Sequence, residues 1–143
     1  MEPYNFNKAR RRYFVIIATL ACDDAIQEGI INKRNATPLL FFFGKAWMNE
    51  KIRKWLSPEG SVELKEKRLL ALVGFLLDKG IVFDGRCYKM TIARMLMKTK
   101  ALDGIRNCMT VVNYLNPKLP REVRANAEQF YEEFWKSSSN FGQ

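Results

Sequence analysis

The side chains in this sequence that are best suited to do chemistry are lysines and arginines, and the chemistry is the binding of anions. They gather at three places. The first cluster is Arg10-Arg11-Arg12, and the second is Arg53 with Lys54. The third is the stretch 86–121, in which eight cationic residues accompany a single carboxylate. Guanidinium and ammonium groups bind phosphate oxygens strongly. We expect a polyanion to contact these clusters, and within the third to contact Arg86, Lys89, Arg94, Lys98, Lys100 and Arg106.

The charge of the whole chain points the same way. Twenty-four lysines and arginines against fifteen acidic residues give a formal net charge of +9. Such an excess favours a nucleic acid, an anionic membrane or an acidic protein surface as partner. The alternative is that the charge serves solubility alone. Against it, the segment that begins at Glu122 is acidic overall, so the charge is polarised along the chain, which a purely solubilising surface does not require.

A helical period would give the third cluster two different faces. Over 86–99, a step of about 100° per residue places Ile92 and Leu96 on one side and Arg94 and Lys98 on the other. One buried face and one cationic face suit a helix that lies along a phosphate backbone. The same pattern also suits the solvated face of a basic protein, so both interpretations stay open.

The first cluster stands where helix stability does not explain it. Cations at a helix N-terminus oppose the helix dipole, so Arg10-Arg11-Arg12 favours an external anion. Tyr4, Phe6 and Tyr13 lie among these arginines and could stack on bases. The alternative, which the sequence favours slightly, is that these rings form the edge of the hydrophobic core.

A helix-turn-helix motif is another hypothesis for the third cluster. Residues 91–96 would form its first helix, Gly104 its turn and 106–115 its recognition helix. The spacing argues against this motif, because its alanine, glycine and next apolar anchor normally stand closer together than Ala93, Gly104 and Val111 do.

Catalytic residue patterns are poor. The chain has no histidine, which removes the commonest general base and zinc ligand. Cys22, Cys87 and Cys108 are far apart and read as reduced core residues of an intracellular protein, either cytoplasmic or nuclear. A nuclease-like pair, Glu63 with Lys65, has no supporting sheet, so a metal-dependent enzyme is a weaker alternative. We expect a non-enzymatic protein without a metal or cofactor.

Helices are the elements that must position these clusters. The stretch 13–22 is apolar on every face, so other elements must surround it, and we expect a central helix at about 7–28. Asp23 and Asp24 then fall near its C-terminal end, where carboxylates oppose the dipole. Gly29 is expected to close this helix in the left-handed conformation.

Capping signals place the next helices. Thr37-Pro38 predicts a helix over 38–56 whose apolar first half, 39–43, belongs in the core. Ser61 predicts a helix over 62–79, in which Gly74 could admit a neighbouring backbone at close range. Further helices are expected over 86–99, 102–115 and 120–136. The sequence thus predicts an all-α, compact single-domain bundle of five to six helices over 1–143, with 137–143 as a flexible tail.

No membrane span is expected, because the apolar run 13–22 is too short to cross a bilayer. Basic residues before an apolar run resemble a signal peptide, but Glu2 and Pro3 begin the chain and Asp23 follows the run at once. A peripheral membrane protein would need the apolar face of the helix 86–99, including Tyr88, to be exposed.

The sequence therefore predicts a non-enzymatic nucleic-acid-binding protein, with RNA favoured over DNA, of the kind found in ribonucleoprotein or nucleocapsid-like assemblies. The alternative is a protein-interaction or self-assembling adaptor subunit that uses the exposed aromatic residues Trp47, Trp55, Tyr131 and Trp135, with charge steering an acidic partner. Convergence of the basic clusters on one surface would favour nucleic acid, and scattered clusters beside an exposed apolar patch would favour the adaptor.

Overall fold

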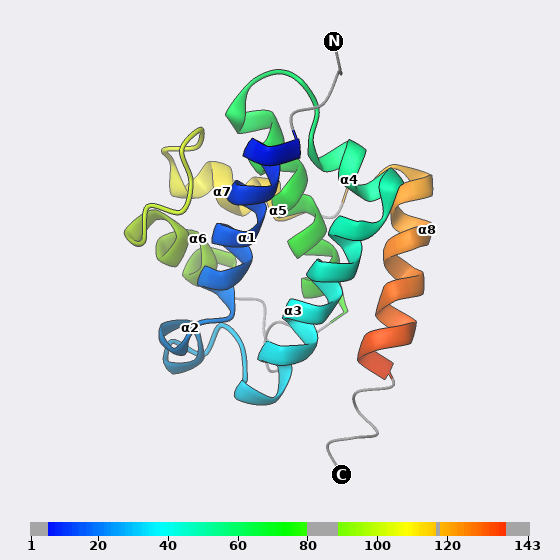
Figure 1. Cartoon of the computed structure of the whole chain (residues 1–143). Helices are drawn as coiled ribbons and strands as arrows, with labels where there is room; N and C mark the ends of the chain where they lie inside the picture. The colour runs from blue at the N-terminus through cyan, green and yellow to red at the C-terminus, as the bar shows by residue number, and fades with distance from the viewer. Residues whose placement is uncertain (1–5, 80–88, 117, 137–143) are drawn as a thin grey trace.

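Every regular element of the computed structural model is helical within the residues that it describes, 6–79, 89–116 and 118–136 (Figure 1). This part of the chain contains no β-strand, which confirms the expected all-α architecture. The elements are α1 Phe6–Leu20, α2 Asp23–Gln27, α3 Lys33–Met48, α4 Glu50–Leu56, α5 Val62–Asp78, α6 Lys89–Lys98, α7 Cys108–Tyr114 and α8 Arg121–Phe130, the last continued by a π-helical segment, Tyr131–Lys136.

The helix that is buried on every face along its second half is α5. All residues from Leu69 to Leu76 are buried, which covers more than two helical turns. In Figure 1 this helix lies behind α1, with α4 and α7 on either side of it. From α3, the ring of Phe42 stacks on Phe75 of α5, with the ring centroids 6.5 Å apart. Helices α1, α3, α4 and α7 therefore pack against α5.

The helix expected at the centre, α1, is only partly surrounded. Its residues Ile16, Ile17 and Leu20 are fully buried, but Val15 on another face is 41% exposed. The buried Tyr13 donates its hydroxyl to the carbonyl of Phe43 at 2.6 Å, which ties α1 to α3. An apolar run with no polar face thus contributes one side to the core and leaves another at the surface.

A close approach of two backbones explains Gly74, as the sequence predicted. A Cβ at this position would overlap the carbonyl oxygen of Leu115 and lie 2.6 Å from its carbonyl carbon. Leu115 follows α7 directly, so the missing side chain lets the end of α7 rest against the middle of α5. A second close approach occurs at Gly104, where a Cβ would lie 2.5 Å from the backbone nitrogen of Glu63.

The single helix predicted over 7–28 is wrong, because α1 ends at Leu20 and α2 begins at Asp23. At the break the thiol of Cys22 donates to the carbonyl of Thr19 at 3.0 Å, which provides a partner for one orphan carbonyl of α1. Asp23 therefore stands in the first turn of a new helix, where a carboxylate is favourable to the dipole. Gly29 has a φ of 76°, which confirms its left-handed closing position.

The helix predicted over 38–56 is also divided differently. α3 begins at Lys33, because the side chain of Asn32 accepts a hydrogen bond from the amide of Arg34 at 2.8 Å and caps the helix earlier than Thr37. Pro38 lies inside α3. Asn49 then interrupts the helix and caps α4 by accepting from the amide of Ile52 at 3.0 Å.

Only the second half of the helix predicted over 102–115 forms. A buried carboxylate, Glu66, accepts hydrogen bonds from the amides of Asp103 and Gly104 at 2.9 and 2.7 Å and fixes this segment outside a helix. The side chain of Asn107 then caps α7 by accepting from the amide of Met109. Because α7 begins only at Cys108, the recognition helix of a helix-turn-helix motif is not formed as the sequence suggested.

Other boundaries agree with the sequence. Ser61 caps α5 through the amide of Leu64, and α5 ends at Asp78, one residue before the predicted end. The predictions on 80–88, which include Tyr88 and Arg86, and the predicted tail 137–143 lie outside the described residues. Among the helices that are described, none is long and apolar enough to cross a membrane.

Candidate nucleic-acid interface

Arg12, from the first predicted cluster, is turned into the protein. Its guanidinium pairs with Asp103, donates to the carbonyl of Ala101 at 3.1 Å and has its Nε 4.0 Å from the carboxylate of Glu66. Burial raises the pKa of Glu66, while the backbone amide of Gly104 and the charge of Arg12 oppose this rise. Arg12 therefore joins α1 to α5 and to the segment before α7, and its charge is largely balanced within the fold.

The other two arginines of this cluster diverge, because successive helical residues point about 100° apart. Arg10 lies over the ring of Phe14, 5.6 Å from its centroid. Arg11 lines a groove of about 440 Å³ together with Lys8 of α1 and Lys65 of α5. Of the aromatic residues near the cluster, Tyr13 is 2% exposed and is therefore not available to a base as the sequence suggested. Phe6 is half-buried, and Tyr4 lies outside the described residues.

The second cluster also has partners within the chain. Arg53 lies over the ring of Phe6, 5.1 Å from its centroid, and Lys54 pairs with Glu50 at 2.7 Å. The hydrogen bond to Lys54 lowers the pKa of Glu50. The ion pair with Glu50 offsets the charge of Lys54, whereas the ring contact leaves the charge of Arg53 in place.

The third cluster is divided among several places. The exposed Arg94 and Lys98 of α6 share a groove with Asp24 and Glu28, whose carboxylates offset their charge. The ammonium of Lys89 donates to the side chain of Asn116 at 3.2 Å. Lys100, with a φ of 55°, and Arg106 are both exposed in the connection between α6 and α7. Of the predicted site residues that the structure describes, Arg11 and Arg12 thus line one groove, and Arg94 and Lys98 line another.

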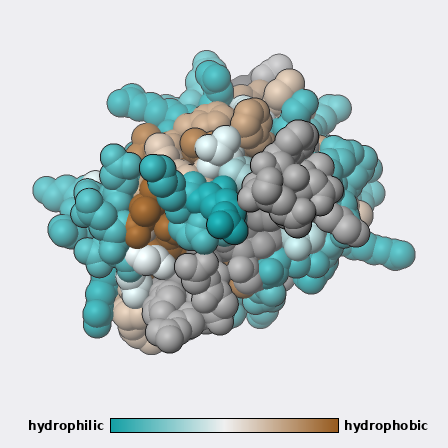
Figure 2. Space-filling model, turned by 90° about the horizontal axis from the view of Figure 1, so that it is seen from below, coloured by the Kyte–Doolittle hydropathy of each residue, from teal (hydrophilic) through white to brown (hydrophobic). Residues whose placement is uncertain are grey.

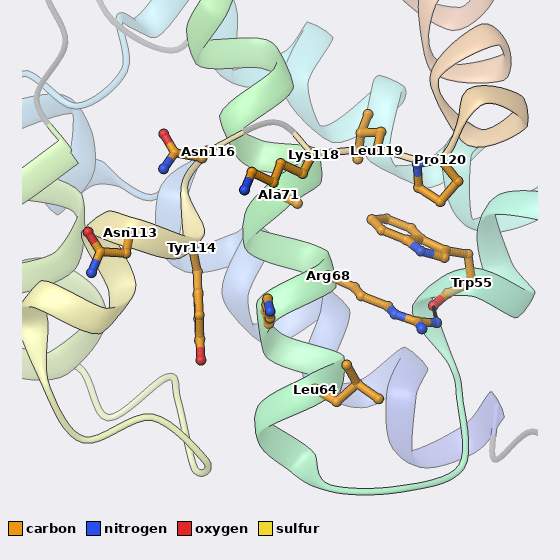
Figure 3. Close-up of a pocket in the computed structure, with 11 residues that line it drawn as sticks. Trp55, Leu64, Arg68, Ala71, Asn113, Tyr114, Asn116, Lys118, Leu119 and Pro120 are labelled. Carbon is orange, nitrogen blue, oxygen red and sulfur yellow. Dashed lines mark hydrogen bonds between the residues drawn. The ribbon is translucent and has the colours of Figure 1, made fainter.

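Cationic and aromatic side chains do gather elsewhere, in a cleft of about 700 Å³ on the outer side of α5 (Figure 3). We call it the aromatic cleft. Its walls come from α4, α5, the end of α7 and the segment before α8. Its lining residues are Trp55, Leu64, Lys67, Arg68, Ala71, Asn113, Tyr114, Asn116, Lys118, Leu119 and Pro120.

A cationic side chain lies over each aromatic ring of this cleft. Trp55 and Tyr114 stand on opposite sides of α5 (Figure 3). The guanidinium of Arg68 lies 5.6 Å from the ring centroid of Trp55 and donates to the Trp55 carbonyl at 2.8 Å. The ammonium of Lys67 lies 5.2 Å from the ring centroid of Tyr114. Lys118 is exposed on the wall that faces α5.

A carboxylate stands at the Tyr114 end of the cleft. The hydroxyl of Tyr114 donates to Glu63 at 2.9 Å, and this hydrogen bond raises the pKa of Tyr114. The bond fixes the direction of the ring. Glu63 is not among the residues that line the cleft itself, whose charged side chains are all cationic.

Sequence reasoning missed most of this site. It named Trp55 among the exposed aromatic residues of the adaptor alternative, and it gave Lys67 and Arg68, in the helix predicted over 62–79, no role. The cleft unites residues from three stretches of the chain, at Trp55, within 64–71 and within 113–120. The one local signal was a pair of adjacent cations, Lys67-Arg68, directly before the long buried run of α5.

An exposed apolar surface lies on α3. Leu40, Phe41 and Met48 are 45, 59 and 70% exposed, and they line a shallow groove of about 470 Å³. The expectation that all of 39–43 belongs in the core is therefore wrong for two of its residues. At one end of the bundle, too, hydrophobic surface emerges between the hydrophilic side chains (Figure 2).

Two expectations of the alternative interpretations are also wrong. Trp47, predicted as an exposed contact of an adaptor, is only 8% exposed and packs against Tyr13 in the core. Ile92 and Leu96 are fully buried, so α6 does not present the apolar face that a peripheral membrane helix needs. Tyr131 and Trp55 are half-buried, and the side chain of Trp135 lies outside the description.

Comparisons with known proteins found no matching family model, curated protein or solved structure. Within the described part of the chain, acidic and cysteine side chains form no group able to hold a metal ion. Cys22 and Cys108 are free thiols, each half-buried against the core.

Proposed function

We propose that this protein binds nucleic acid, with RNA favoured over DNA, and performs no chemistry on it. The observation that carries the proposal is the aromatic cleft, in which Lys67, Arg68 and Lys118 accompany the rings of Trp55 and Tyr114. Cations that track a phosphate backbone, interleaved with aromatic rings, are the combination by which proteins bind single nucleic-acid strands.

The groove beside α1, in which four cations accompany the single carboxylate of Asp103, would extend this surface. Lys65 lines that groove with Lys8 and Arg11, and Lys67 and Arg68 line the aromatic cleft from the other flank of the same helix. A strand that crosses the first turns of α5 would therefore meet cations on both sides. Binding through such contacts is expected to be strongly salt-dependent and weakly sequence-specific.

The proposal is tested by fluorescence anisotropy with labelled RNA and DNA at low and physiological salt. We expect the double variant Lys67→Glu/Lys118→Glu to bind more weakly and to reduce the slope of log K against log salt by about 1.4, because it loses two phosphate contacts to a single strand. The matched control is Arg94→Glu/Lys98→Glu, on a groove whose cations already face carboxylates, and it should bind nearly normally. Absence of binding to any nucleic acid at low salt would refute the proposal.

A second candidate function is a protein-interaction or self-assembling subunit, favoured by the exposed apolar surface of α3. Phe41 and Met48 belong to side-chain types that are enriched at protein interfaces. If this surface joins two copies of the chain, the mass measured by light scattering should rise with concentration, and Phe41→Ser should abolish the rise. A monomer at all concentrations would exclude self-assembly through α3.

A further inference from the structure

The rings of the aromatic cleft suit an unpaired base. Bases in a duplex stack on one another and hide their faces, whereas the bases of a single strand can stack on protein side chains. Trp55 and Tyr114 stand apart, with the small side chain of Ala71 on α5 between them (Figure 3). A cleft of about 700 Å³ has the size that buries a small organic group.

The two cations over the rings differ in how firmly they are held. Arg68 is anchored by its hydrogen bond to the carbonyl of Trp55, so its guanidinium stays on the indole and offers its own plane for stacking. Lys67 reaches the ring of Tyr114 on a flexible stem. Its ammonium can therefore leave the ring for a phosphate while a base takes its place on the ring.

The opposite wall supplies a further phosphate ligand. Lys118 is exposed, and in Figure 3 its side chain extends past Ala71 toward the side on which Asn116 and Tyr114 lie. A base on Tyr114 would thus have ammonium groups of Lys67 and Lys118 within the same cleft. Base stacking and phosphate neutralisation are supplied by different residues, so they can be separated experimentally.

We infer that the aromatic cleft holds an unpaired nucleobase on the ring of Tyr114, with its phosphate on Lys67 and Lys118, so that the protein selects single strands over duplexes. This inference rests on the proposed function and names the form of nucleic acid that the site takes.

The experiment measures the affinity of the full chain for four probes by anisotropy and competition. The probes are a single-stranded RNA oligonucleotide, a duplex of the same sequence, an abasic strand of the same length and a free mononucleotide. We expect the wild type to prefer the single strand to the duplex and to the abasic strand. Tyr114→Leu should lose about tenfold or more in affinity for the single strand, within the range of one base–aromatic stack, and keep its affinity for the duplex and the abasic strand.

Two further variants separate stacking from folding and from charge. Tyr114→Phe keeps the ring and loses the bond to Glu63, so it should retain single-strand affinity. Lys118→Glu should weaken binding to the single and the abasic strands alike, and its exposed position leaves the fold intact even if Tyr114→Leu unfolds.

The outcomes distinguish the inference from the function on which it rests. Salt-dependent binding of single strand, duplex and abasic strand with equal affinity, unchanged in Tyr114→Leu, would overturn the inference and leave nucleic-acid binding in place. A mononucleotide that binds as tightly as the strand would overturn strand selection and identify a nucleotide site. No binding of any probe at low salt would refute both.

Discussion

Gly74→Ala tests whether the bundle depends on the close approach of α7 to α5. Alanine is favoured over glycine inside a helix by about 1 kcal/mol, so propensity alone predicts a more stable protein. At this position, however, the added Cβ would overlap the carbonyl oxygen of Leu115, which is backbone and cannot rotate away. Overpacking of a core costs about 1–3 kcal/mol, and a rigid neighbour favours the upper end. We therefore expect a net loss of about 2 kcal/mol.

Gly44→Ala is the matched control. Gly44 also lies inside a helix, α3, but a Cβ there would meet nothing within 4 Å. This variant should gain up to about 1 kcal/mol by propensity. The two variants are compared by urea unfolding followed by far-UV circular dichroism, and by the melting temperature, for which about 3 °C per kcal/mol is expected in a chain of this size. The reasoning is refuted if Gly74→Ala is as stable as the wild type or more stable.

Two further predictions concern buried and capping polar groups. Glu66→Gln keeps the shape of the side chain. Its amide group, however, points a donor at one of the two backbone N–H groups that now donate to the carboxylate. The free energy of unfolding should therefore fall by about 1–3 kcal/mol at neutral pH. Because burial raises the pKa of Glu66 above 4.5, the native state retains its proton longer than the unfolded state. Wild-type stability should therefore contain a component that falls as pH rises from about 4.5 through the raised pKa, and this component should be missing from urea titrations of Glu66→Gln across the acidic range. Asn49→Ala removes both the cap of α4 and the hydrogen bond that its amide donates to Asn126, and Asn49→Ser restores the cap alone. The serine variant should therefore be about 1 kcal/mol more stable than the alanine variant, and equal stability of these two variants would show that the cap contributes nothing.

The sequence predicted those features that depend on local chemistry alone. The cap at Ser61 and the close approach at Gly74 follow from residue types that have few other uses in a helix. The interruptions were not predictable in the same way. Asn49 is one of several polar residues in a helical apolar pattern that continues from Trp47 to Ile52 and Trp55. The segment around Gly104 leaves the helical conformation because of a carboxylate on another helix, Glu66. Periodicity within one segment carries no information about such a distant partner.

The candidate site was harder to predict because the order of charged residues along the chain does not show which of them are neighbours in the fold. In the sequence, the acidic segment that begins at Glu122 is separate from the cations of 86–121, so their charge was expected to have no carboxylate partners. In the fold, carboxylates of α8 instead lie beside cations of other parts of the bundle. Glu128 pairs with Lys79, which follows α5, at 3.0 Å, and Glu122 lies 3.9 Å from Lys51 of α4.

The cations that remain for an external anion are therefore decided by packing. Arg12 belongs to the densest cationic cluster of the sequence. Its guanidinium nevertheless pairs with Asp103 and donates to the carbonyl of Ala101. Lys67 instead has an aromatic ring as its neighbour, and a ring leaves the positive charge unneutralised. A cation held by a π-face keeps its charge for a phosphate, whereas a cation held by a carboxylate does not. Arg10 of the arginine run also lies over a ring, that of Phe14, but its neighbour Arg12 is held by carboxylates. The aromatic cleft is the better candidate because every charged residue that lines it is cationic and two of these cations lie over aromatic rings.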